Sequence, residues 1–194
     1  MWATTLWDHG AAPLQWGVAM GAALVGALCD VVARRVPNVL TVPVLATGLG
    51  WAAWIGGASG LLDSAVACIM LSAPFVLLFA LASGGAGDAK LMGALGAWLG
   101  LVNGAAALGC VAVAGVGMAV GVALAGKRLR RVLTNVALFA KWPLIRLAVG
   151  KSATKDFTAA MPGADMMQKM PYGPAIFAGV CLAAIGVNLW RSWG

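Results

Sequence analysis

Two aspartates at the edges of apolar segments are the residues best suited to chemistry in this chain. Asp30 lies in the stretch Cys-Asp-Val-Val-Ala-Arg-Arg-Val-Pro-Asn, and Asp88 ends the sequence Gly-Ala-Gly-Asp. An ionisable residue beside a membrane-length apolar stretch costs free energy, so it marks a candidate functional site. Two carboxyl groups that share one proton can activate water, which is the chemistry of aspartic proteases. Asp30 and Asp88 are therefore the candidate catalytic pair.

Few other side chains could take over this role. The six acidic residues are all Asp, and the single histidine, His9, lies near the opposite expected membrane face. The cysteines fall in apolar segments without a C-x-x-C pair, which argues against a zinc site or a disulfide framework. They are Cys29, Cys68, Cys110 and Cys181. We expect a reaction that needs no metal and no other cofactor.

The composition is that of a membrane protein that crosses the bilayer several times. Of the 194 residues, 62% are hydrophobic and only 10% are charged, which excludes an ordinary soluble domain. We expect one all-α membrane-embedded domain over residues 1–194, with six transmembrane helices. The apolar windows lie at 12–32, 38–57, 61–82, 89–103, 104–126 and 171–190.

The basic residues predict the orientation of these spans. With the Arg34–Arg35 loop in the cytoplasm, all of the 13 Lys and Arg residues except Arg191 fall on the cytoplasmic side. Both termini then lie outside the cytoplasm. The tryptophans expected at the outer interface are Trp2, Trp7, Trp51, Trp54, Trp98, Trp190 and Trp193. We expect this orientation in the inner (plasma) membrane of a cell.

One long cytoplasmic segment, 127–170, predicts a helix on the membrane surface followed by a polar loop. At helical periodicity its basic residues gather on one side and its apolar residues on the other, which is typical of an interfacial amphipathic helix. The net charge of +7 is concentrated between apolar runs, so we expect anionic lipid headgroups rather than nucleic acid as partners.

This topology places the two aspartates at the same depth. Asp30 would end the first span and Asp88 would begin the fourth, both at the inner face. Gly85 and Gly87 permit positive φ and close backbone approach, as an extended peptide substrate would need. The alternative is structural: both acids could cap helices or pair with Arg34 and Lys90, and Lys90 could be a snorkelling anchor.

Three groups of residues together resemble the prepilin and preflagellin peptidases, the GxGD class of intramembrane aspartic proteases. The first is Asp30 with Arg35, Pro37 and Asn38. The second is Gly85-Ala86-Gly87-Asp88-Ala89-Lys90-Leu91, and the third is Pro171-Tyr172-Gly173-Pro174-Ala175-Ile176 at the start of the last span. The similarity runs in order and spacing from about residue 12 to 190.

The resemblance implies that Asp30 and Asp88 cut a short basic leader from type IV pilin-like precursors at the cytoplasmic face. Site-shaping or substrate-binding roles are implied for Gly85, Gly87, Lys90, Asn38, Pro171, Tyr172, Gly173 and Pro174. The larger relatives carry paired C-x-x-C motifs that are missing here, so methyltransferase activity is not expected. The short form resembles the peptidases of tight-adherence (Flp) pili or the archaeal preflagellin enzymes, and the Pro-Tyr-Gly-Pro match favours the former. Two other classes stay open: an ion-coupled transporter that uses the same aspartates, and a pilus-assembly component without catalysis.

Overall fold

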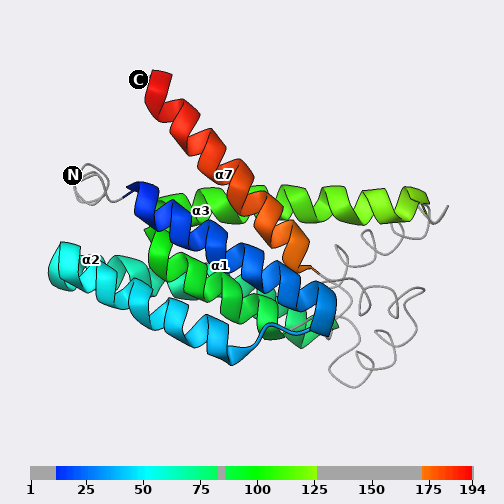
Figure 1. The fold of residues 1–194 in the computed structure, drawn as a ribbon, viewed down its shortest axis with the longest axis horizontal. Coiled ribbons are helices and arrows are strands. Elements are labelled where there is room, and N and C mark those ends of the chain that lie inside the picture. The colour runs from blue at the N-terminus through cyan, green and yellow to red at the C-terminus, as the bar shows by residue number, and fades with distance from the viewer. Residues whose placement is uncertain (1–11, 83–85, 126–171, 194) are drawn as a thin grey trace, which may run out of the picture.

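The computed structural model describes residues 12–82, 86–125 and 172–193, and these form an all-helical bundle (Figure 1). Its helices are α1 (Ala12–Ala33), α2 (Asn38–Ala82), α3 (Ala86–Ala125) and α7 (Gly173–Trp193). The expected amphipathic helix within 127–170 lies outside the described residues.

Six separate spanning helices, as the apolar windows predict, are not supported. The described residues contain four helices that are long and apolar enough to cross a membrane. This indicates a multi-pass membrane protein and corrects the expected helix count. Large apolar side chains lie on the outside of the bundle, as a lipid environment requires, and examples are Val32, Val39 and Trp54.

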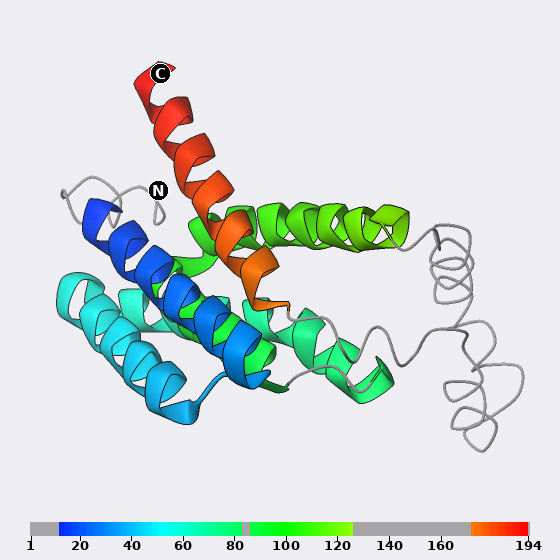
Figure 2. The ribbon, with the colours of Figure 1, turned by 45° about the vertical axis from the view of Figure 1, so that its right-hand side comes forward.

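The difference in count arises at two glycines. Gly57 in α2 and Gly100 in α3 have non-helical backbone angles with φ of 58° and 69°, which glycine adopts at little cost. At each of them the helix turns back on itself (Figures 1 and 2). A straight helix of 45 residues would be about 68 Å long, more than twice the thickness of a hydrocarbon core. We call the two parts of each helix its arms: 38–56 and 58–82 in α2, 86–99 and 101–125 in α3.

The first arm of α3 is the centre of the bundle, because every residue from 91 to 100 is buried. Small residues let its neighbours approach closely. A Cβ on Gly96 would lie 2.7 Å from the Ala67 carbonyl oxygen, in the second arm of α2. A Cβ on Gly48, in the first arm of α2, would lie 2.8 Å from the Trp98 side chain. Helices packed through small residues in this way are typical of membrane proteins.

The other helices pack around this centre. Leu91 fills the space beside Gly26 of α1, and α7 contacts both α3 and α1. The largest fully buried side chains are Leu71, Leu91, Met92, Leu95, Leu99, Ile176, Val111 and Val180. Because Asp88 stands at the start of the central arm, the best-packed part of the molecule fixes the backbone that carries it.

Candidate active site

Asp30 lies in the last turn of α1 and is buried, with 8% of its surface exposed. Its Oδ2 accepts a hydrogen bond from the backbone N–H of Gly173 over 2.8 Å. Helix α1 ends just after it, because Arg34 adopts a left-handed conformation with φ of 51° while its N–H still bonds to the Asp30 carbonyl oxygen. The polar side chain thus points into the bundle, where the first residue of α7 meets it.

Gly173 meets Asp30 at a point with no space for a side chain. A Cβ there would lie 2.8 Å from the Ala27 Cα and 2.9 Å from the Asp30 Cβ. The sequence suggested a site-shaping role for Gly173, and the contact supplies a physical reason. Ala27 was not singled out, because a single alanine in an apolar run carries no distinctive signal.

Asp88 lies in the first turn of α3 and is partly buried. Asp30 and Asp88 are near enough for the charge of Asp30 to act on Asp88, and the end of α1 lies beside the start of α3 in both views (Figures 1 and 2). The first turn of α3 also places the Asp88 carboxyl near the positive end of the helix dipole.

Gly87 approaches the loop between α1 and α2. A Cβ on Gly87 would lie 3.0 Å from the Val36 backbone nitrogen. The backbone of Gly87 is helical and not of positive φ, so this glycine serves close approach alone. Its neighbour is the buried Val36 of the same chain, a residue that the motif reading passed over.

Lys90 and Asn38, both implied by the resemblance, contact each other. The Lys90 Nζ donates a hydrogen bond to the Asn38 Oδ1 over 2.9 Å, and both side chains are exposed. The pair joins the start of α2 to the start of α3. Lys90 therefore has a specific polar partner, which a simple snorkelling anchor would not need.

Tyr172 completes the same end of the bundle. Its ring meets Phe75 of α2 edge-on, with centroids 5.8 Å apart, and its hydroxyl lies beside Gly115 of α3. Burial, and secondarily the negative charge of Asp88, raises the pKa of the Tyr172 phenol above 10. Pro174 follows in the first turn of α7, a position that suits proline. Gly85 and Pro171 lie outside the described residues.

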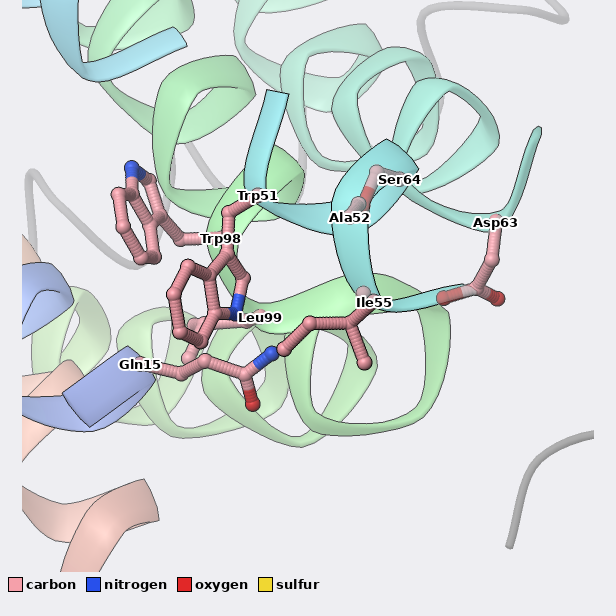
Figure 3. A pocket seen from close by; sticks show the side chains of 9 residues that line it. Gln15, Trp51, Ala52, Ile55, Asp63, Ser64, Trp98 and Leu99 are labelled. Carbon is pink, nitrogen blue, oxygen red and sulfur yellow. The ribbon is translucent and has the colours of Figure 1, made fainter. Parts of the chain in front are cut away.

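A small pocket beside the start of α1 and the reversals of α2 and α3 holds none of the expected site residues (Figure 3). Gln15, Trp51 and Trp98 line it, with the two indole rings stacked at a centroid distance of 6.1 Å. Asp63 also lines this pocket, and its Oδ2 accepts a hydrogen bond from the Leu101 N–H over 3.2 Å. It thereby caps the second arm of α3 just after the reversal at Gly100.

The comparisons with known proteins agree with the motif reading. A model of the type IV leader peptidase family matches residues 17–124, which include both Asp30 and Asp88. Among curated proteins and among solved structures, none matches the chain.

Proposed function

The chain belongs to the type IV leader peptidase family, and from this premise we propose that it is an aspartic endopeptidase in which Asp30 and Asp88 activate water. The substrate is a type IV pilin-like precursor of the Flp kind, from which the enzyme removes a short basic leader. The observation that carries the proposal is the meeting of Asp30, Asp88 and the start of α7 at one end of the bundle.

The two carboxyls have complementary roles in this reaction. One is ionised and takes a proton from the attacking water, while the other is protonated and polarises the scissile carbonyl. The tetrahedral intermediate then collapses, the C–N bond breaks, and the amine leaves with a proton from the carboxyl pair. The products are the free leader acid and the mature pilin with a new N-terminus. No covalent enzyme intermediate and no cofactor are required.

We further propose that the aspartate end of the bundle faces the cytoplasm across the inner membrane. The basic residues next to the two aspartates in sequence are Arg34 and Arg35, shortly after Asp30, and Lys90, shortly after Asp88. Basic residues on the cytoplasmic side are what the positive-inside rule predicts. Trp54, just before the reversal at Gly57, and Trp190 and Trp193, at the end of α7, are exposed, as an outer aromatic belt requires. The apolar helix of the precursor would then lie in the bilayer beside the bundle, with its leader at the site.

The decisive experiment follows cleavage of a fluorescent pilin precursor by the protein reconstituted in vesicles. We expect Asp30→Asn and Asp88→Asn each to abolish cleavage. Asp63→Asn is the matched control, because an asparagine oxygen can still accept the hydrogen bond from Leu101. Cleavage at the normal rate by either of the first two variants would overturn the proposal.

The same preparation tests the other classes. A transporter would lose ion flux in the Asp30→Asn and Asp88→Asn variants and would show no processing activity. An assembly component would cleave nothing in the unsubstituted form. Mass spectrometry of the mature product, with a methyl donor present, should find an unmethylated N-terminus.

A further inference from the structure

The junction of Tyr172 and Gly173 connects the two aspartates through separate contacts. Gly173 bonds to Asp30, and Tyr172 contacts α2 and the second arm of α3, the helix whose first turn carries Asp88. We propose that this junction is a positioning element, which sets the place of the Asp30 carboxyl relative to Asp88. The inference rests on the proposed function, and it assigns a role that the family match over residues 17–124 does not reach.

The bond from Gly173 is an interhelical cap. The Tyr172 carbonyl oxygen accepts hydrogen bonds from the N–H groups of Ala175 and Ile176, so Tyr172 is the cap residue just before α7, which begins at Gly173. The first N–H groups of a helix have no partner within the helix and are usually capped by a nearby side chain. Here a carboxyl from α1, 143 positions away in sequence, takes the N–H of Gly173. The start of α7 therefore restrains the orientation of Asp30.

Tyr172 restrains the start of α7 in turn. Its ring packs against Phe75 of α2 and its hydroxyl reaches Gly115 of α3, where any Cβ would overlap the phenol. The charge of Asp88 acts on the same phenol. If the Tyr172 ring lost these contacts, Gly173 would move and Asp30 would move with it. Asp88 would stay in place, because it belongs to the central arm of α3.

Such restraint matters because both carboxyls must reach one water molecule. Hydrogen-bond distances for proton transfer are about 2.6–3.2 Å, and a misplacement of about 1 Å can cost roughly 100-fold in rate. Neither Tyr172 nor Gly173 needs to touch the substrate for this effect. They are positioning residues, and their loss should lower kcat more than it changes KM.

Three glycine variants in α7 provide a matched test. In Gly173→Ala the new methyl group would meet Ala27 and Asp30, and in Gly179→Ala it would meet the Val111 backbone, away from the carboxyls. In Gly186→Ala the methyl group would meet nothing within 4 Å. All three would be purified at full length, checked for thermal stability and assayed well below their melting temperatures with a fluorescent precursor.

We expect Gly173→Ala to lower kcat about 100-fold with KM changed less than about threefold, and to displace the pH–rate profile, which reports on the carboxyl pair. Gly179→Ala should lose at least as much thermal stability, yet keep kcat within about threefold and keep the pH profile. Gly186→Ala should match the unsubstituted protein. Equal losses of kcat in Gly173→Ala and Gly179→Ala, or an unchanged pH profile in Gly173→Ala, would overturn the inference.

Tyr172 is tested by conservative rescue. Tyr172→Phe keeps the ring on Phe75 and should keep kcat within about threefold, whereas Tyr172→Leu should lose about tenfold or more. If Tyr172→Leu kept kcat as well as Tyr172→Phe does, the aromatic ring would not be what positions the start of α7. Asp30→Asn and Asp88→Asn distinguish the proposed function from the positioning role. Active asparagine variants would overturn the proposed function itself. If the asparagine variants were inactive but Gly173→Ala and Gly179→Ala had the same kcat, the positioning role alone would be overturned.

Discussion

The Lys90 Nζ and the Asn38 Oδ1 are 2.9 Å apart, so the residue two positions after Asp88 holds the first residue of α2. The loop between α1 and α2 is thereby held at both ends. It starts directly after α1, and Lys90 bonds to the residue that follows it, Asn38. Val36, within this loop, is buried beside Gly87. The polar pair and the apolar contact together fix the loop against the start of α3.

The Lys90–Asn38 bond should contribute modestly to stability, because both groups are exposed. We expect Lys90→Met and Asn38→Ala to be coupled by about 1 kcal/mol or less. A double-mutant cycle on unfolding of the detergent-solubilised protein measures this coupling. Coupling well above that value would mean that the pair belongs to a larger buried network.

Gly87→Ala should slow cleavage, because its Cβ would lie 3.0 Å from the Val36 nitrogen and 3.1 Å from the Val36 Cβ. The loop or the first turn of α3 must shift by a few tenths of an ångström, and Asp88 is the next residue. We expect kcat to fall about tenfold. Gly50→Ala, whose methyl group would meet nothing within 4 Å, is the control and should cleave normally.

Gly96→Ala should lower the folding stability of the bundle. Its Cβ would lie 2.7 Å from the Ala67 carbonyl oxygen and 2.9 Å from the Ala67 carbonyl carbon, and backbone atoms cannot rotate away. We expect a loss of about 1–3 kcal/mol, the usual cost of overpacking. Gly109→Ala, in the second arm of α3, has open space for its methyl group. It should therefore equal or exceed the stability of the unsubstituted protein. Thermal unfolding in detergent would compare Gly96→Ala, Gly109→Ala and the unsubstituted protein. Equal melting temperatures would contradict the close packing at Gly96.

The raised pKa of the Tyr172 phenol predicts that the protein loses stability at alkaline pH. Its pKa is raised above the ordinary value of 10 by burial and then by Asp88, so the folded state keeps the proton that the unfolded state releases. The resulting stabilisation is present below pH 10 and is lost as the pH rises through the folded-state pKa. Tyr172→Phe should show a smaller loss of stability over that range. Cleavage between pH 6 and 8 should have the same pH dependence in Tyr172→Phe, because the phenol stays neutral there.

The proposed orientation predicts which positions a membrane-impermeant thiol reagent reaches in intact cells. Single cysteines would replace Arg35, beside the aspartate end, and Ser59, just after the reversal at Gly57, in a variant without the four native cysteines. Both positions are exposed. We expect labelling at 59 from outside and at 35 only after permeabilisation. The opposite pattern would reverse the orientation while leaving the fold intact.

The sequence indicated a candidate site, whereas its hydropathy windows predicted a wrong number of spanning helices. Asp30 and Asp88 stood out because carboxyls are rare and costly beside apolar segments, and that rule depends on composition alone. The same hydropathy windows could not distinguish a loop from a one-residue reversal. Gly57 and Gly100 are two of 27 glycines, and only the three-dimensional path shows which of them leave the helical region.

The supporting contacts were harder to foresee. Phe75, Gly115 and Val36 are ordinary residues for a membrane helix or its loop, and their roles come from which neighbours they meet. The role of Asp63 as a cap at Leu101 likewise depends on two arms being side by side. Motifs indicate the candidate catalytic residues, whereas tertiary packing identifies the residues that contact them.

The bond between Asp30 and Gly173 also has a consequence for biosynthesis. Its two partners are 143 residues apart, and a ribosome adds roughly 5–20 residues each second. Asp30 and Asp88 therefore emerge many seconds before the glycine that restrains one of them. A nascent chain that holds both acids is still an unfinished protease, so its activity should begin only when the last helix has joined the others in the bilayer.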